Sequence, residues 1–211
     1  MKRSLIATCL VIAGVLAWFV GFQGIETPRI SDAAQVTGQL NFPEAGISFR
    51  PPDGWYVLSA QDSARIMQNV DSGSDELDEM LRSPDPTLLI RVARDKTTLG
   101  VNPAISINLY PGEIIDFEAA FDTLLTVLSQ TSDFELLEGP VADPLGPFEA
   151  QRIRYKFSAQ SSGIRLEVTE VLWLVPRGLQ YLVISSGAAT EDAEELLPVL
   201  IKSARSLDLL N

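Results

Sequence analysis

The stretch IRLEVTEVLWLVPRGLQYLVISSG, residues 164–187, predicts two long strands joined by a tight turn. Apolar and polar residues alternate over 164–169, which is the two-residue period of a strand with one dry and one wet face. Residues 171–175 are all apolar, and a sheet accepts such a run only where both of its faces are covered. Pro176-Arg177-Gly178 then combines a ring-fixed φ with a residue free to take positive φ. The stretch therefore predicts a hairpin in the middle of a sheet.

The composition predicts one acidic domain with an appendage. The chain has 211 residues, 46% of them hydrophobic, which is enough for a sizeable core. The net charge is −12, and residues 46–211 alone hold 13 basic and 25 acidic side chains. So negative a domain repels phosphate backbones, and we expect no nucleic-acid partner.

The single cysteine and the lack of histidine exclude several kinds of bond and site. Cys9 is the only cysteine, so no intrachain disulfide can form, and it lies too early in the apolar run for a lipoprotein signal. The chain has no histidine, which removes the commonest general base at neutral pH and the usual zinc ligand. We expect no metal, no cofactor and no catalytic residue.

The N-terminal segment predicts a membrane anchor. After Lys2 and Arg3, residues 4–22 carry no charge, and as a helix they would span about 28 Å, close to the thickness of the hydrocarbon core of a bilayer. The positive end should stay in the cytoplasm. The alternative is a cleaved signal peptide, but no small-x-small site follows the run. We expect a single-pass protein of the cytoplasmic membrane: an anchor over 1–22, a flexible tether over 23–45 and a periplasmic domain over 46–211.

Periodicity places the other elements of that domain. Strands are expected at 87–96, 104–110, 134–137 and 150–158, and helices at 59–70 and 75–82, with a loop over 139–147. The clearest helix is 117–130, whose apolar residues recur at spacings of three and four residues, as on one face of a helix. Asp116 can cap its N-terminus. A last helix is expected at 192–207, with Asp192 and Glu195 as a capping box and Pro198 as a kink or a start.

The opening residues GISFRPPDGWYVL, 46–58, predict a strand, a turn and a strand. They resemble the signature that begins domains of the PsbP-like, or Ran-binding Mog-type, fold group, which includes bacterial DcrB-like and LpqN-like envelope proteins. The residues that carry the resemblance are Gly46, Phe49, Pro52, Gly54 and Trp55. The resemblance implies an α+β domain in which an antiparallel sheet lies between helices. It implies no catalytic group, and members of the group bind very different partners.

One cluster of cations is a candidate partner or anion site. Arg152, Arg154, Lys156 and Arg165 alternate with apolar residues and could line one face of the sheet. The other interpretation is cross-strand pairing with carboxylates such as Glu149 and Glu167.

Two further clusters have both a functional and a structural interpretation. The acidic residues could bind a divalent cation weakly or form a solvated helix face, and the aromatic residues could line a ligand or fill the core. The acidic group is Asp71, Asp75, Glu76, Asp78 and Glu79; the aromatic group is Trp55, Tyr56, Trp173 and Tyr181.

The sequence as a whole favours a membrane-anchored, non-enzymatic accessory domain of the bacterial envelope that binds an envelope protein. No nucleophile elbow and no phosphate-binding glycine loop occur. Two alternatives stay open: an envelope hydrolase or lyase that uses two carboxylates, and a module that binds a small ligand or a lipid.

Overall fold

The structure is a computed structural model that describes residues 19–20, 33–66, 70–73, 75, 78–79, 82–95, 100–161 and 163–210. Within these ranges, no helix has both the length and the apolar character needed to cross a membrane. Most of the expected anchor lies outside them. Its residues Phe19–Val20 form strand β1, which pairs antiparallel with β7 (Gly100–Val101). Because their backbone pairs with β7, these two residues are in a strand where we expected a helix.

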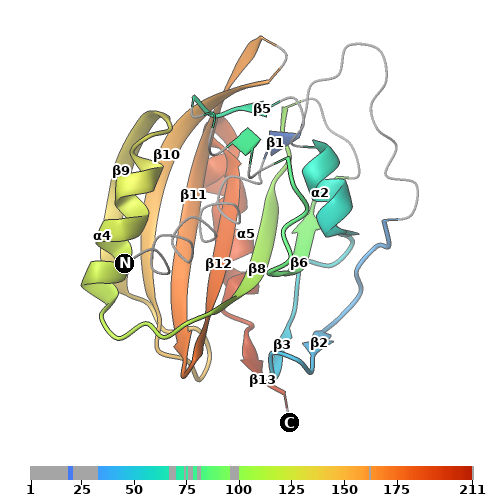
Figure 1. The fold of residues 1–211 in the computed structure, drawn as a ribbon. Helices are drawn as coiled ribbons and strands as arrows, with labels where there is room; N and C mark the ends of the chain where they lie inside the picture. Colours follow the sequence, from blue (N-terminus) through green and yellow to red (C-terminus); the bar gives the residue numbers. More distant parts are fainter. Residues whose placement is uncertain are drawn as a thin grey trace.

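The hairpin expected over 164–187 is confirmed and lies at the centre of the main sheet (Figure 1). β11 (Ile164–Arg177) and β12 (Gln180–Ala189) pair antiparallel through a turn in which Gly178 has φ +66°. Residues 171–175 are all buried. The described strands of this sheet run in the order β4 (Tyr56–Leu58), β6 (Leu88–Ala93), β8 (Ala104–Pro111), β12, β11, β10 (Gln151–Ser161) and β5 (Val70–Asp71), and β9 (Ser132–Ala142) also pairs with β10.

The first residues of β11 differ from the expected pattern. Ile164 was expected on the dry face but is exposed. The register explains this. β12 pairs with β11 only from Val168 onward, so residues 164–167 of β11 pair with β10 alone and have no strand on their other side.

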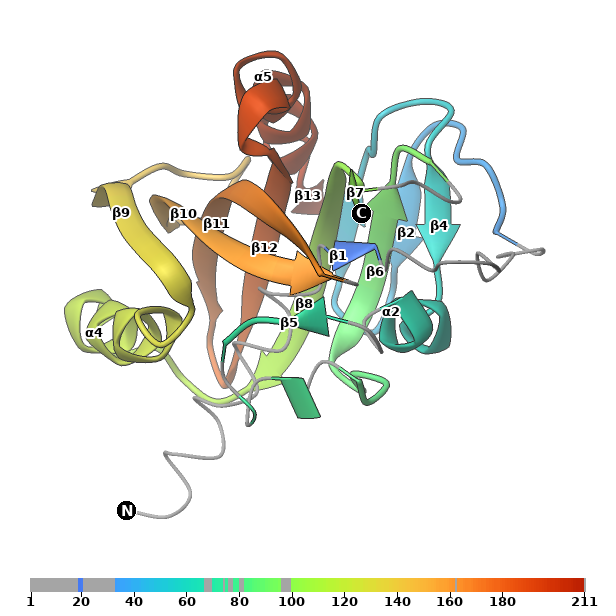
Figure 2. The same cartoon turned by 90° about the horizontal axis from the view of Figure 1, so that it is seen from above.

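Helices lie on both sides of the sheet, as expected for the α+β class (Figure 2). One side carries α5 (Ala193–Ala204); the other carries α4 (Phe117–Leu128) and α2 (Ala60–Ile66). The expected cap of α4 is confirmed, because the Asp116 carboxylate accepts a hydrogen bond from the Glu118 N–H at 2.9 Å. Of the expected helix over 75–82, Asp75, Asp78 and Glu79 are helical, and four of its other residues lie outside the described ranges.

The last helix begins differently from the prediction. The 3-10 turn η2 (Thr190–Asp192) precedes α5, and Asp192 has φ −99° and ψ −2° instead of the extended conformation of a capping residue. Its side chain makes no capping hydrogen bond, so the predicted capping box is wrong. The expected apolar stripe from Ala193 to Leu207 is buried.

The opening of the domain forms a second, smaller sheet, and this corrects two expectations. β3 (Ile47–Phe49) pairs with β2 (Leu40–Phe42) and β13 (Asp208–Leu209), whereas β4 belongs to the main sheet. The two strands of the expected opening hairpin are therefore in different sheets. Residues 33–45 are packed rather than a free tether, because β2 pairs with β3 and Val36 is buried.

The signature residues occupy the connection between the two sheets. Phe49 and Trp55 are buried in the core, and Gly46 and Gly54 have φ +58° and +84°, which favour glycine. Pro52, in the turn between them, accepts a hydrogen bond from the Trp55 N–H. The motif thus sets the path from β3 into β4.

β9 is longer than the strand expected at 134–137, and it includes part of the expected loop over 139–147. It extends to Ala142 and contains Pro140. In the described sheet β9 pairs with β10 alone, and an edge strand tolerates a proline because only one side of it needs N–H donors.

The centre of β11 should dominate the stability of the domain. Leu172 is fully buried, so we expect Leu172→Ala to lower the free energy of unfolding by about 2–5 kcal/mol, because it removes buried methyl groups and leaves a cavity. Leu179→Ala, in the exposed turn of the same hairpin, should change it by less than about 0.5 kcal/mol. Urea denaturation measures both, and equal losses would contradict this assignment of the core.

Candidate functional site on the face of strands β9 to β11

The four cations predicted as a patch lie on one face of the main sheet. Arg152, Arg154 and Lys156 are alternate residues of β10, so their side chains point to the same side. Arg165 on β11 pairs with Gln160, which belongs to the same alternating set of β10. Directly paired residues share a face, so all four cations are brought together.

Carboxylates of β9 pair with most of this patch. Glu135 contacts Lys156 at 2.7 Å and, with its hydrogen bond and charge, raises the pKa of that ammonium above its ordinary value. Asp133 contacts Arg165 at 2.8 Å, and Glu167 lies 3.6 Å from the same guanidinium. Glu167 is on the same strand as Arg165, and no ion pair of the described residues includes Glu149, so the cross-strand partners are carboxylates of β9 instead of the two expected.

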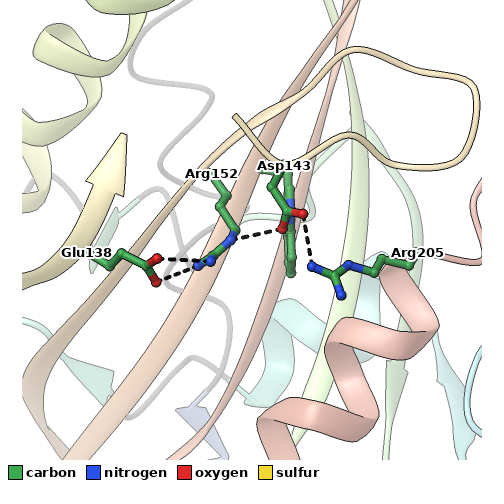
Figure 3. Close-up of polar contacts among 5 residues, drawn as sticks. Glu138, Asp143, Arg152 and Arg205 are labelled. Carbon is green, nitrogen blue, oxygen red and sulfur yellow. Dashed lines mark hydrogen bonds and ion pairs between the residues drawn. The ribbon is translucent and has the colours of Figure 1, made fainter. Parts of the chain in front are cut away.

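Arg152 has the most complete set of contacts, and Figure 3 shows them. Glu138 holds it with two parallel bonds of 2.7 and 3.0 Å, a fork geometry that suits a guanidinium. Its Nε lies 2.9 Å from Oδ2 of Asp143. The same Asp143 carboxylate accepts a hydrogen bond from the Trp173 indole N–H at 3.0 Å and contacts Arg205 at 2.9 Å.

The Asp143 carboxylate thus joins three elements of the fold. Arg152 belongs to β10, Trp173 to β11, and Arg205 follows the last residue of α5. Asp143 is mostly buried, where a charged group is costly unless it is hydrogen-bonded, and all its contacts here are with donors. We assign this group a structural role: it fixes the end of α5 to the sheet.

Arg154 is the exception within the patch. Among the described residues it makes no ion pair, and its buried Nε has no hydrogen-bond partner. Its neighbours in the register are Glu138 on β9 and Val171 on β11. Of the four cations, Arg154 alone is therefore left for an anionic partner, because Arg152, Lys156 and Arg165 are already paired with carboxylates.

The acidic cluster shows structural contacts. Asp78 is buried, accepts a hydrogen bond from the Ser72 N–H at 3.0 Å and lies 3.5 Å from Arg82. Asp71 accepts a hydrogen bond from the Gly73 N–H. Glu76 lies outside the described residues. Within the described ranges no group of three or more histidine, cysteine, aspartate or glutamate side chains is placed to hold a metal ion.

The opposite face of the sheet has a buried polar row that sequence reasoning missed. Tyr155 pairs with Glu170, and Ser185 pairs with Ser106, which in turn pairs with Arg91; all five are buried. The Ser106 and Ser185 hydroxyls are 2.8 Å apart. Glu170 pairs with Gly187 and Ser185 pairs with Leu172, so the two sets are offset by two residues on the same face, and together they extend from β10 to β6.

Burial and charge shift two groups of this row. Burial lowers the pKa of Arg91 to about 10, although the charges of Asp85 and Glu170 partly oppose this. Burial and the neighbouring Glu170 raise the pKa of the Tyr155 phenol well above its ordinary value. Burial disfavours the charged form of both groups; at neutral pH Tyr155 is neutral, whereas Arg91, with a pKa of about 10, keeps its charge.

The predicted aromatic cluster does not form a cage. Trp55 and Trp173 are buried at different places in the core, and Trp173 is bound to Asp143. Tyr181 stacks on Tyr110 with 5.4 Å between ring centroids. These side chains fill the interior.

The Asp143 group should contribute measurably to stability. We expect Asp143→Asn to lower the free energy of unfolding by about 1–3 kcal/mol, because it removes the charge shared by the buried Trp173, the mostly buried Arg152 and the exposed Arg205. Glu135→Gln is the matched control, since its pair with Lys156 is more exposed and solvent screens it, so its loss should change stability much less than the loss of the Asp143 charge. If denaturation gives the two variants the same stability, the structural role of Asp143 is wrong.

The Tyr181 phenol gives a prediction about pH. Burial raises its pKa from the ordinary 10.0 to about 12. The neutral phenol therefore favours the folded state fully below pH 10, and this contribution is lost as the pH rises through about 12. Tyr181→Phe should remove a tyrosinate absorbance step near pH 12 and flatten the decline of stability between pH 10 and 12. If Tyr181→Phe removes an absorbance step near pH 10 instead of near pH 12, the raised pKa of Tyr181 is wrong.

Comparison with known proteins supports the architecture. No family model and no curated protein sequence matches the chain. The crystal structure of LpqN, involved in cell envelope biogenesis of Mycobacterium tuberculosis, is similar at 15% identity and TM-score 0.50, over 90% of this chain and 98% of that one. The solution structure of cyanobacterial PsbP (CyanoP) from Synechocystis is similar at 10% identity and TM-score 0.51, over 89% and 98%. The chain therefore has the PsbP-like fold that it shares with LpqN and CyanoP.

Proposed function

We propose that the protein is a membrane-anchored, non-enzymatic accessory domain of the bacterial cell envelope that binds a protein partner. The fold is shared over nearly the whole chain with LpqN, which is involved in cell envelope biogenesis. The uncharged run over 4–22 is long enough for a single span, with the domain on the periplasmic side. The carboxylates of β9 and of Asp143, which follows β9, hold cations of the neighbouring strand β10, which suits a structural more than a catalytic use.

The anchored form requires one change from the structure. A span over 4–22 includes Phe19–Val20, and these residues pair with β7 in the structure. Without its last four residues the run would cover only about 22 Å as a helix, which is short for a bilayer. Insertion of the whole run therefore separates β1 from β7.

The observation that carries the partner-binding proposal is the open edge of β9. Over its 11 residues β9 pairs with β10, and the described residues provide no second strand beside it. Leu136 and Leu137, in the middle of this edge, are 39% and 41% exposed. Leu136 pairs with Tyr155 and so belongs to the face opposite the cations, and Leu137 is the next residue of the strand, so the two leucines leave apolar surface along the edge of β9 that a partner could cover.

The shape of β9 indicates how a partner would bind. Its register with β10 shifts at three places, and Pro140 removes one donor. Such irregularities bend an edge strand away from further pairing. The partner would therefore contact the leucine side chains and the ion pairs instead of adding a strand to the sheet.

In-cell photocrosslinking tests this proposal. A photoreactive residue at Leu137 should give one discrete crosslinked product, and Leu136→Glu in the same chain should abolish it, because a partner that covers this edge must contact both leucines. Val199 on α5 is the matched control, because its exposure of 44% is similar. Identical products from both positions, or a product that survives Leu136→Glu, would refute binding at β9.

A further inference from the structure

The two most exposed large apolar side chains of the described residues lie at the same end of the main sheet. Ile115 is 88% exposed, in the connection from β8 to α4, and Leu179 is 80% exposed, in the turn between β11 and β12. The two segments touch, because the Gly112 N–H donates a hydrogen bond of 2.9 Å to the Leu179 carbonyl. We name residues 112–115 and 178–179 the end loops; they lie at the lower end of the sheet in Figure 1.

The turn that carries Leu179 is held in place by its neighbours. The Arg177 guanidinium donates a hydrogen bond to the Ala45 carbonyl and lies over the Phe148 ring, 5.3 Å from its centroid. On the other side of the turn, Tyr181 stacks on Tyr110. The core beneath the turn is therefore already filled, and Leu179 has no place in it.

We infer that the end loops rest on the membrane surface, with Leu179 and Ile115 inserted at the boundary between headgroups and acyl chains. Two aliphatic side chains on projecting loops are far too small a surface for a stable protein interface, which needs about 800 Å² from each partner. Insertion into lipid needs no complementary surface, only apolar side chains that reach about 5–10 Å below the headgroups. This inference rests on the proposed anchor, which would hold the domain beside the bilayer.

β7, with which Phe19–Val20 pair, lies at the opposite end of the sheet, so this orientation needs the separation of β1 described above, and the length of the connecting chain then permits it. Residues 23–32, between the proposed span and the first packed residues, reach at most about 33–36 Å when extended. Ala34 accepts a hydrogen bond from Val57, which lies in the same row of the sheet as Ser186. Ser186 is six residues beyond the start of β12 at Gln180, or about 20 Å from the end loops. The connection is therefore long enough to bring this end to the bilayer.

The charges nearby favour neutral lipid. Glu113 is exposed, and Asp116, which caps α4, is exposed one residue beyond Ile115. Anionic headgroups would repel these carboxylates and the domain as a whole, which carries −12. The contact is therefore apolar, and we expect it to survive added salt and to weaken with anionic lipid.

Fluorescence quenching in liposomes tests the inference on the full-length protein. Two variants, Leu179→Cys and Ile115→Cys, each also carry Cys9→Ala, so that each has a single cysteine for an environment-sensitive dye. The labelled protein is reconstituted into phosphatidylcholine vesicles that contain a quencher attached to lipid. Ile164→Cys is the matched control, since Ile164 is 40% exposed and is the first residue of β11, at the end of the strand away from the end loops. We expect quenching at 179 and 115 to be several-fold stronger than at 164. Equal quenching at all three positions would overturn the inference.

The native Cys9 separates failure of this inference from failure of the proposed anchor. Cys9 lies within the run over 4–22, so a dye on the unchanged protein reports whether that run is in lipid. Quenching at Cys9 without excess quenching at 179 and 115 leaves the anchor standing and overturns the contact of the end loops. No quenching at Cys9 overturns both. A photocrosslink from position 179 to a protein, without lipid quenching there, would overturn the lipid contact in favour of a protein surface.

Discussion

The burial of both faces of the β11–β12 hairpin is the constraint on which the rest of the structure depends. Residues 171–175 have no polar side chain, so each face of the sheet must be covered. α5 supplies the cover on one side, and the Asp143 group fixes the end of that helix to β10 and β11. β8 pairs with β12 on one side of the hairpin. On the other side β10 pairs with β11, and β9 pairs with β10, so neither strand of the hairpin is at an edge of the sheet.

Local pattern was enough for the elements whose burial follows a simple period. The central hairpin and α4 were predicted because residues 171–175 are continuously apolar and because the helix repeats apolar residues at three and four. The small sheet was missed because its strands have two or three residues, too few to show a period, and because β13 pairs with β3 across most of the chain. The capping box failed because a 3-10 turn before α5 changes the backbone at Asp192.

The sequence predicted that the cations of the candidate site share one face, but it did not predict which carboxylates pair with them. Alternation along β10 places Arg152, Arg154 and Lys156 on one face without any knowledge of the sheet. Their carboxylates come from β9, and three register shifts decide which of them meet, which no spacing in the sequence reveals. The interior row did leave a signal, because Glu170 continues the alternating set that contains Val168 and therefore falls on the dry face.

The position of β3 in the small sheet has a consequence for biogenesis. β3 lies between β2, where the packed part of the chain begins, and β13, which ends at residue 209. During folding, the β13 side of β3 stays unpaired until residues 208–209 reach it, so the pairing of β13 with β3 joins two segments that lie far apart in the sequence. A copy that lacks β13 would leave the backbone donors and acceptors of β3 unpaired on that side, and an unpaired strand edge is open to proteases and to pairing with other chains.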